Sequence, residues 1–275
     1  DLERSEILCR AGEAIGLVIE RKGHYRLTRK GAVLIGLPGV TALIEHHKIL
    51  YQDLLNPVGF FKGVEETQLS KFWPYVFGGG MDLKSSEVEK YSDLMSESQH
   101  LVAADTLAAV NIPSVCRFLD VGGGKGTFVS ELKKIYPKVD AAVFDLPGSH
   151  SETSGHRCII GSFKEDELPA GYDIISLVRI LYDHRDETIR DLLGKAYGAL
   201  DKGGRLIVSE PMLGADRPTL WGDVYFAMYT LAMSTGKTRS PDQVSEFIKD
   251  AGFSNVTIHK SARPFITTVI EARKT

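Results

Sequence analysis

The pattern of apolar and polar positions changes near residue 110 of the chain. Before that point apolar residues such as Ile7, Leu8 and Ala11 recur at helical spacing. After it, short apolar runs alternate with helical segments, which is typical of a parallel sheet covered by helices. The pattern therefore predicts an α/β protein whose first part is mainly helical.

Seven short apolar runs predict the strands of this sheet. The predicted strands cover 115–120, 141–145, 157–160, 172–177, 204–209, 256–259 and 265–272. Helices are predicted over 127–136 and 186–200, and a further helix begins at Ser240, where Pro241 and Gln243 complete an N-terminal capping pattern. Only the eleven residues 146–156 join the second and third strands, whereas a parallel crossover usually needs about a dozen or more. Either this connection is a loop or a segment of the natural chain is absent, and we favour the second explanation.

Residues 1–40 read as a helix followed by a hairpin, with Leu17–Ile19 and Tyr25–Leu27 on either side of a turn. A helix followed by a small wing suggests a winged-helix unit. The segment holds seven Lys or Arg against five Asp or Glu, and the whole chain has a net charge of -3. This weak basic excess favours a packing or dimerisation role over DNA contact, and we expect no nucleic-acid partner.

Residues 41–110 are predicted to be helical and are rich in aromatics. The crowded positions are Phe60, Phe61, Phe72, Trp73, Tyr75 and Phe77, followed by the glycines 78–80. They are either ordinary core or one wall of an apolar substrate pocket with the glycines as a flexible joint.

Composition adds mainly exclusions. The hydrophobic content of 43% and charged content of 25% are ordinary for a soluble protein of 275 residues. The three cysteines are widely separated, which argues against disulfides or a zinc site and favours a reducing, cytoplasmic location.

We predict no metal, because the adjacent His46 and His47 would point about 100° apart on a helix. No apolar run approaches the roughly 20 residues of a membrane span. The chain begins inside a helical pattern at Asp1, so we expect further residues upstream.

The turn between the first strand and the first helix carries the candidate cofactor chemistry. Its glycines, Gly122, Gly124 and Gly126, alternate with other residues, whereas the dinucleotide-binding pattern would place a glycine at Thr127. Asp120 ends the strand, and a carboxylate there would repel a pyrophosphate but suits an ammonium group. S-adenosylmethionine carries an ammonium and a sulfonium and no phosphate, so this turn predicts that cofactor.

Asp145 ends the second strand, 23 residues after Gly122. This is the place of an acidic residue that accepts hydrogen bonds from both ribose hydroxyls, and Leu146 beside it could pack on an adenine. Either Asp120 or Asp145 alone could be a loop or capping carboxylate. Their order on successive strands favours a shared cofactor site.

From about residue 10 onward the chain resembles the small-molecule O-methyltransferases that join a dimerising winged-helix domain to a methyltransferase domain. The matching motifs are Asp-Val-Gly-Gly-Gly-Lys-Gly at 120–126, Phe-Asp-Leu-Pro at 144–147, Tyr-Asp-His-Arg-Asp-Glu at 182–187, Gly-Gly-Arg-Leu-Ile-Val-Ser-Glu-Pro at 203–211 and Thr-Gly-Lys-Thr-Arg-Ser at 235–240. Four stretches are most similar to the carotenoid hydroxyl methylases of the demethylspheroidene (hydroxyneurosporene) type: 47–57, 72–77, 177–184 and 222–240.

The resemblance implies a Rossmann-like methyltransferase sheet, parallel with a final antiparallel strand and preceded by a small winged-helix domain. The implied domains are a winged-helix dimerisation domain at 1–40, truncated at its start, a helical linker and pocket wall at 41–110, and a methyltransferase domain at 111–275. The resemblance also implies a homodimer, because members of this family dimerise through their N-terminal domains.

The family's cofactor residues carry over where this sequence matches. The candidate cofactor-binding set is Asp120, Gly122, Gly124, Asp145, Leu146, Ser162, Phe163 and Arg179. Ser162-Phe163 stands where the family has an acidic residue and Met, so Phe163 can still stack on the adenine while the acidic contact is lost. Val178 replaces the family's methionine-side lysine. Arg179 opens an Arg-Ile-Leu-Tyr run that is shared with the more distant bacteriochlorophyllide C-20 methyltransferase.

Methyl transfer requires in-line alignment of the acceptor with the methyl group and removal of a proton. The family's general base, a His, is Tyr182 here, and a phenol with an ordinary pKa of about 10 is a poor base that can still orient a hydroxyl. Glu210 aligns with the Glu that supports the base, and Thr238 replaces a further acidic residue. His184 is the second candidate for the base. The alternative is that Tyr182 is a core residue and His184 a surface residue.

Three classes of function follow. The first is methylation of a hydroxyl on an apolar isoprenoid, a hydroxylated carotenoid, with transient membrane contact. Its pocket would be lined by the segment 60–77 and by Met95, Tyr225, Phe226, Met228, Tyr229 and Met233. The second is C-methylation of a bacteriochlorophyllide-type macrocycle or O-methylation of another small aromatic metabolite. The third, which the low basic charge disfavours, is a cofactor-sensing or DNA-binding regulator.

Overall fold

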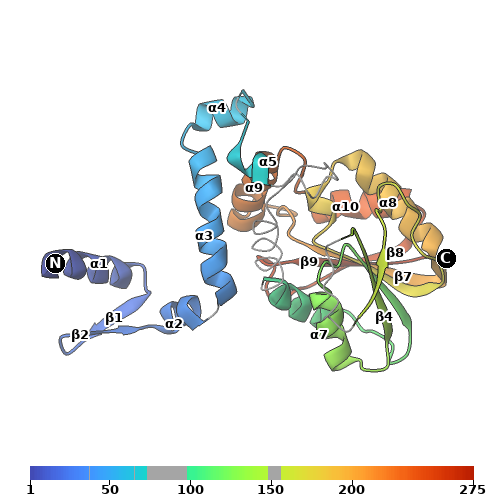
Figure 1. Ribbon diagram of the computed structural model, residues 1–275, viewed down its shortest axis with the longest axis horizontal. Coiled ribbons are helices and arrows are strands. Elements are labelled where there is room, and N and C mark those ends of the chain that lie inside the picture. The colour runs from blue at the N-terminus through green and yellow to red at the C-terminus, as the bar shows by residue number, and fades with distance from the viewer. Residues whose placement is uncertain (37, 65, 73–97, 148–155) are drawn as a thin grey trace. The chain divides into compact units, whose positions relative to one another are not determined.

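A computed structural model describes the chain except for residues 37, 65, 73–97 and 148–155 (Figure 1). The chain divides into two compact units, Asp1–Ile49 and Leu50–Thr275. Among the described residues, no helix is both long enough and apolar enough to cross a membrane.

The first unit contains the predicted helix and hairpin. Its elements are α1 (Leu2–Ala14), β1 (Val18–Arg21), β2 (His24–Leu27), α2 (Arg29–Gly36) and the start of α3 (Pro38–Asp53). The antiparallel hairpin turns at Lys22 and Gly23, whose φ angles of 54° and 76° match a two-residue turn of type I′. Gly31 of α2 lies so close to the Leu17 carbonyl oxygen that an added Cβ would be 2.0 Å away. A side chain at Gly31 would therefore separate the helix from the hairpin.

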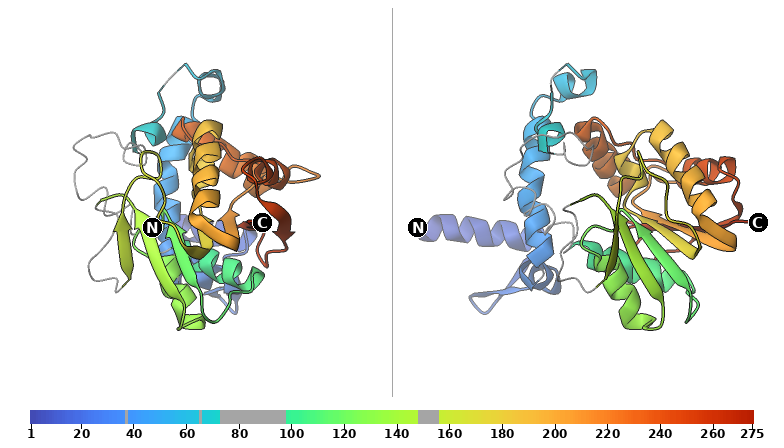
Figure 2. Two further views of the ribbon diagram at one scale, coloured as in Figure 1. Left: turned by 90° about the vertical axis from the view of Figure 1, so that its right-hand side faces the viewer. Right: turned by 45° about the vertical axis from the view of Figure 1, so that its right-hand side comes forward.

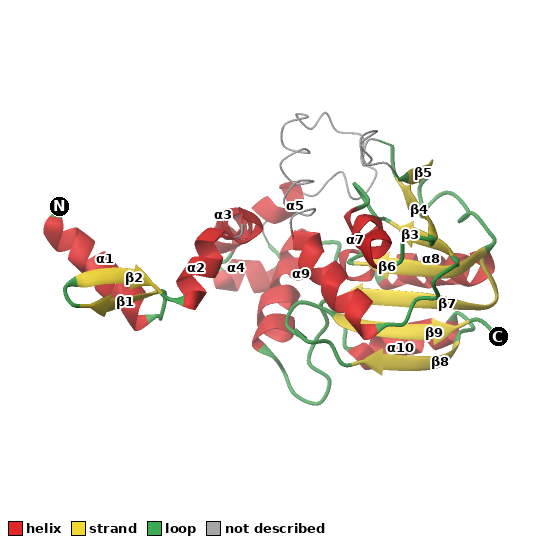
Figure 3. Ribbon diagram, turned by 90° about the horizontal axis from the view of Figure 1, so that it is seen from below, coloured by secondary structure: helices red, strands yellow, loops and turns green. Residues whose placement is uncertain are grey.

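The second unit is built on a seven-stranded sheet in the order β5-β4-β3-β6-β7-β9-β8. The strands are β3 (Arg117–Val121), β4 (Asp140–Asp145), β5 (Arg157–Ile160), β6 (Tyr172–Val178), β7 (Leu200–Glu210), β8 (Ser254–His259) and β9 (Thr268–Arg273). The first five pair in parallel, and β9 is antiparallel to both of its neighbours (Figure 3). The predicted sheet, parallel with a final antiparallel strand, is confirmed.

Helices cover both faces of the sheet. Those of the second unit are α4 (Pro57–Lys62), α5 (Gln68–Phe72), α7 (Thr127–Ile135), α8 (Asp186–Ala199), α9 (Ala227–Met233) and α10 (Pro241–Asp250), with a further helical stretch at 98–109. Figures 2 and 3 show α7 on one face and α8 with α10 on the other. The side chains of β3 alternate accordingly, because Phe118 packs in the α7 cluster and Leu119 in the α8 cluster.

Most predicted boundaries agree with the structure to within a few residues. β5 has the predicted bounds, and Ser240 caps α10 through a complete capping box with Gln243. β7 begins earlier than predicted, because Leu200 pairs with Tyr172 across an irregularity in the ladder. β4 and β5 pair directly in parallel. Residues 148–155 of their connection lie outside the described residues, so the expected missing segment stays a prediction.

Candidate functional site

The predicted site residues gather at one edge of the sheet. Asp120 and Asp145 lie at the carboxyl ends of β3 and β4, Ser162 follows β5, Arg179 follows β6, and Glu210 ends β7. These strands are neighbours and parallel, so their carboxyl ends share one edge. That edge is where open α/β sheets bind their ligands.

The glycine-rich loop is shaped by backbone angles that glycine tolerates. Gly122, Gly124 and Gly126 have φ angles of 71°, 54° and 77°. The Gly122 amide donates to the Phe144 carbonyl at 2.8 Å, which ties the loop to β4. A Cβ on Gly122 would lie 2.3 Å from the Ile180 Cδ1 atom. The loop therefore fits closely between two strand ends, and Gly126 begins α7.

Asp120 is a buried carboxylate with one open oxygen. Its side chain is 1% exposed, and its Oδ1 atom accepts a 2.6 Å hydrogen bond from the Ser176 hydroxyl. The Oδ2 atom has no hydrogen-bond partner, and a Cβ on Gly123 would lie 2.4 Å from it. Burial raises the pKa of Asp120 to about 7, Ser176 lowers it and the charge of Asp145 raises it further. A buried anion with a free acceptor beside a glycine backbone can receive a cationic group.

Asp145 is held by the backbone around it. Its Oδ2 atom accepts a 2.6 Å hydrogen bond from the Gly124 amide, and its Oδ1 atom accepts one of 2.6 Å from the Leu146 amide. The carboxylate is half-buried. These bonds fix its orientation at the end of β4, and a carboxylate oxygen can accept more than one hydrogen bond.

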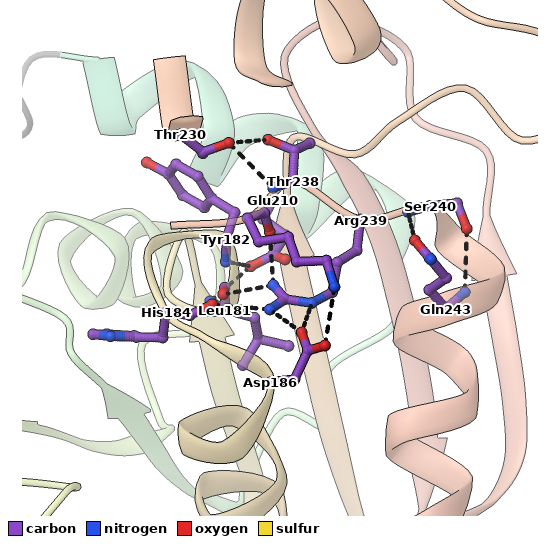
Figure 4. A network of polar contacts seen from close by, with 11 residues as sticks. Leu181, Tyr182, His184, Asp186, Glu210, Thr230, Thr238, Arg239, Ser240 and Gln243 are labelled. Atoms are coloured by element: carbon purple, nitrogen blue, oxygen red, sulfur yellow. Dashed lines mark hydrogen bonds and ion pairs between the residues drawn. The ribbon is translucent and has the colours of Figure 1, made fainter. Parts of the chain in front are cut away.

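Phe163 and His184 meet across the sheet edge. Their rings pack edge to face with centroids 5.2 Å apart. Burial lowers the pKa of His184 to about 4, and Lys164 and Arg239 lower it further. His184 is therefore a neutral and weak base at pH 7. Figure 4 shows its ring pointing in a different direction from the ring of Tyr182.

Tyr182 lies in a short 3-10 turn, Leu181–Asp183. Glu210 binds the backbone amides of this turn. The Glu210 side chain is 1% exposed, and its Oε2 atom accepts from the backbone amides of Leu181 at 2.9 Å and Tyr182 at 3.3 Å. Burial raises the pKa of Glu210 to about 7, against the lowering effect of Arg239 and of the backbone bonds. Glu210 thus contacts the backbone of the turn, and its Oε1 atom has no hydrogen-bond partner.

Arg239 donates hydrogen bonds to the backbone carbonyl groups of the same turn (Figure 4). Its guanidinium, 1% exposed, donates to the carbonyls of Leu181 at 3.2 Å and His184 at 2.9 Å and pairs with Asp186 at 2.5 Å. The Lys237 amide adds a 2.8 Å bond to the Tyr182 carbonyl. Arg239 lies in the Thr-Gly-Lys-Thr-Arg-Ser motif, but no role was predicted for it from the sequence. The only signal for it was a lone arginine in that motif.

Arg179 and Asp183 accompany Tyr182. Tyr182 is 3% exposed, and burial and Asp183 raise its pKa while Arg179 lowers it. The charges of Arg179 and Asp183 thus both act on the Tyr182 hydroxyl. Arg179, predicted as a cofactor residue, also donates to the Ser98 hydroxyl at 2.7 Å. Four ionisable groups, with Glu210, therefore share the interior around the turn.

An aromatic helical segment packs beside this cluster. It comprises a π-helical turn, Leu220–Phe226, continued by α9. The rings of Tyr182 and Phe226 lie 6.3 Å apart, and those of Tyr225 and Phe226 lie 4.7 Å apart. Thr230 and Thr238 join their hydroxyls at 3.0 Å behind them. Of the predicted pocket wall, Trp73, Tyr75, Phe77 and Met95 lie outside the described residues.

Across the described part of the chain no group of three or more His, Cys, Asp or Glu side chains could hold a metal ion. The described geometry places a buried carboxylate at the end of β3, a second carboxylate at the end of β4 and a phenol on the turn after β6.

Comparison with known proteins identifies the class. The O-methyltransferase domain family matches residues 51–254, and the chain belongs to this family. The enzyme class predicted from the sequence is confirmed. The demethylspheroidene O-methyltransferase of Rhodobacter capsulatus is 45% identical over 276 residues, which cover 99% of this chain and 70% of that protein. The enzyme of the same name from Cereibacter sphaeroides is 42% identical, covering 98% of this chain and 74% of that protein.

Solved structures share the fold. A methyltransferase of calicheamicin biosynthesis superposes with a TM-score of 0.81 at 18% identity, over 100% of this chain and 84% of that one. Human N-acetylserotonin methyltransferase, solved with SAM, gives 0.71 at 23% identity over the same shares. These matches extend across both units of the chain.

Proposed function

We propose that this protein transfers the methyl group of S-adenosylmethionine to the hydroxyl of a demethylspheroidene-type carotenoid. The observation that carries the proposal is the 45% identity to a demethylspheroidene O-methyltransferase over 99% of the chain. The reaction is O-methylation, as in the family to which the chain belongs.

The cofactor supplies an electrophilic methyl group on a sulfonium, and the chain's own residues hold it. The open Oδ2 atom of Asp120 accepts the ammonium of the methionine part, which removes the cost of an unpaired buried carboxylate. Asp145 accepts from the ribose hydroxyls, with Gly124 and Leu146 fixing its orientation. Phe163, supported by His184, packs on the adenine. His184 acts in this account as a packing residue.

The acceptor side needs alignment and a route for one proton. Tyr182 presents its hydroxyl from the turn that Glu210 and Arg239 hold, so it orients the substrate hydroxyl. Tyr225, Phe226 and Tyr229 give this side an aromatic lining suited to an apolar chain. Glu210 supports the turn rather than contacting the acceptor.

An assay with labelled S-adenosylmethionine tests the substrate directly. Three acceptors are compared: a hydroxylated carotenoid, a bacteriochlorophyllide and a simple catechol. We expect turnover of the carotenoid, with a new methoxyl group in the product. Turnover of only the catechol or only the macrocycle would overturn the substrate assignment and leave the cofactor assignment standing.

The first unit supports a proposed dimer. No residue of α1 is buried, and its apolar side chains are strongly exposed, with Leu2 at 87% and Leu8 at 74%. Such an apolar helix face in a unit of winged-helix type suits contact with a second copy. Light scattering should give twice the mass of one chain, and Leu8→Glu should shift the protein toward a monomer. A monomer at all concentrations in the unmodified protein would contradict this.

Two further proposals come from the substrate and the cysteines. A carotenoid partitions into membranes, so we propose transient contact of the enzyme with a lipid surface. Cys9, Cys116 and Cys158 are free thiols, in keeping with a cytoplasmic location. Sedimentation with and without vesicles that carry the carotenoid tests the first of these.

A further inference from the structure

The segment 236–239 bonds to the phenol-bearing turn on one side and to the aromatic helical segment on the other (Figure 4). On the side of the turn, the Lys237 amide donates to the Tyr182 carbonyl at 2.8 Å. On the side of α9, the next amide, that of Thr238, donates to the Thr230 hydroxyl at 3.2 Å. Consecutive residues of one short segment therefore connect two parts of the site.

The hydroxyls of Thr238 and Thr230 form a buried chain of two donors. Their Oγ1 atoms lie 3.0 Å apart, and the two residues are 6% and 2% exposed. A hydroxyl has one proton to donate, and Thr230 directs its own to the carbonyls of Phe226 at 3.0 Å and Ala227 at 3.2 Å. Thr238 is therefore the donor within the pair.

This chain ends where the helix changes its winding. Phe226 is the last residue of the π-helical turn, and Ala227 is the first residue of α9. A π-helix pairs residues five apart and an α-helix pairs residues four apart, so two hydrogen-bond registers meet at this junction. The Thr230 hydroxyl bonds to a carbonyl on each side of the junction and so fixes its place in the sequence.

The position of the junction decides where the aromatic rings lie. The Phe226 ring packs edge to face with the rings of Tyr182 and Tyr225, at centroid distances of 6.3 and 4.7 Å. Gly236 allows a close approach, since a Cβ there would lie 2.7 Å from the Tyr182 carbonyl oxygen and 3.1 Å from the Thr230 Cβ. A residue without a side chain thus separates the turn from α9 at this point.

We propose that the 236–239 segment couples the aromatic lining to the phenol of Tyr182, with Thr238 as the positioning residue that fits this lining to a long apolar acceptor. The proposal rests on the proposed function. Thr238 acts through Thr230 and the helix junction, so it sets how the rings that pack on the acceptor chain lie relative to the phenol that orients the acceptor hydroxyl. The pair of hydroxyls is neutral, so it holds this arrangement without burying a charge beside an apolar substrate.

Two acceptors separate this role from a general loss of structure: the long hydroxylated carotenoid and a short isoprenoid alcohol that lacks most of the chain. Thr238→Val removes the donor and keeps both the side-chain size and the backbone bond to Thr230. KM for the carotenoid should rise by about 10-fold, the scale of one hydrogen bond, while kcat and the KM for the short alcohol stay near the wild-type values. Thr238→Ser keeps the hydroxyl and should restore the carotenoid KM.

Ser245→Ala is the matched control. Ser245 also carries a buried hydroxyl, 6% exposed, which donates to the Pro241 carbonyl at 2.8 Å, but it lies on α10. This variant should keep the carotenoid KM. Equal rises of the carotenoid KM in Ser245→Ala and Thr238→Val, or equal rises for both acceptors in Thr238→Val, would contradict the positioning role.

Thr230→Val tests whether the two hydroxyls act as one chain. It should raise the carotenoid KM at least as much as Thr238→Val does, and the double variant should show no larger rise than Thr230→Val alone, because both changes break the same chain. Rises that multiply would show that the two threonines act separately. Gly236→Ala should lower kcat as well, because its Cβ would press on the Tyr182 carbonyl. Unchanged kinetics in Gly236→Ala would contradict the coupling.

Acceptor binding gives a readout without turnover. A conjugated polyene quenches the fluorescence of a nearby indole, and Trp221 belongs to the π-helical turn, so quenching reports carotenoid binding in the presence of S-adenosylhomocysteine. Thr238→Val should raise the dissociation constant of the carotenoid by about 10-fold and leave that of S-adenosylhomocysteine unchanged. Failure of the wild type to bind or methylate the carotenoid would overturn the proposed function itself. Wild-type binding with an unchanged carotenoid dissociation constant in Thr238→Val and Thr230→Val would overturn the coupling alone.

Discussion

The glycine-rich loop and the turn at 181–184 lie at neighbouring strand ends but are stabilised in different ways. The loop is held by local means, since Gly122 bonds to the end of β4 and Gly124 to Asp145. The turn is held by side chains that come from far along the chain, Glu210 and Arg239. The loop keeps an open acceptor on Asp120, whereas the turn has its backbone groups tied down. The difference suggests a division of tasks between holding a cofactor and aligning an acceptor.

The largest effect is expected at the turn. Arg239→Ala leaves the carbonyls of Leu181 and His184 without their donor and opens a buried space, so the free energy of unfolding should fall by on the order of 3 kcal/mol. Urea unfolding measures this. Arg190→Ala, which removes an exposed pair with Asp250, is the control and should cost below about 1 kcal/mol. Equal losses of unfolding free energy in the two variants would show that the turn does not depend on Arg239.

At the loop, affinity and stability should move in opposite directions. Asp120→Asn removes the anion for the ammonium, so the affinity for S-adenosylmethionine should fall by on the order of 100-fold. The same change removes a buried carboxylate with an unpaired oxygen, so the protein without cofactor should be as stable or more stable. Calorimetry and thermal unfolding check both parts. Unchanged affinity would remove Asp120 from the cofactor site.

Gly122→Ala should have a smaller effect of the same kind. A side chain at a φ of 71° costs roughly 1–2 kcal/mol, and its Cβ would press on Ile180. We expect weaker cofactor binding with the turn otherwise intact. Gly194→Ala on α8, where an added Cβ meets nothing within 4 Å, is the control and should bind normally.

The pH dependence links the two regions. Burial raises the pKa values of Asp120 and Glu210 to about 7, above their ordinary values of 3.8 and 4.5. Between about pH 4 and 7 these two carboxyls hold more protons in the folded protein than in the unfolded chain, whereas His46 and His184, with pKa values lowered to about 4, hold fewer. The contribution of each carboxyl to stability should fall as pH rises through this window, by at most about 1.4 kcal/mol per pH unit, and the contribution of each histidine should rise. Cofactor affinity should rise over the same window, because binding needs ionised Asp120.

Unfolding free energies with and without S-adenosylmethionine at several pH values test this sign. Asp120→Asn should flatten the pH dependence of cofactor affinity and leave the contribution of Glu210 to stability. The same pH dependence of stability in the wild type, Asp120→Asn and Glu210→Gln would contradict the burial of both carboxyls.

The same contrast explains what the sequence could predict. The loop was predicted from local spacing, because a strand, alternating glycines and Asp120 are adjacent in the chain. The parallel sheet was predicted from the alternation of apolar runs and helices, and its final antiparallel strand from the family resemblance. These features are encoded within a few residues of one another.

The contacts of Arg239 and Glu210 with the turn were not predicted, and the reason is physical. Arg239 contacts Leu181 and His184 more than fifty positions earlier, and one arginine in a polar motif gives no sign of its partner. Glu210 was predicted from alignment with the family, but the structure shows that it bonds to backbone amides rather than to the phenol. His184 was a candidate base, and only packing reveals its ring against Phe163. Side-chain direction depends on tertiary contacts.

The division of tasks is tested most directly by measuring cofactor affinity and carotenoid turnover together in Asp120→Asn and Tyr182→Phe. The account predicts a crossed result: the first variant loses affinity for S-adenosylmethionine, and the second binds it normally but turns over about 100-fold more slowly. Loss of the same property in both variants would contradict it.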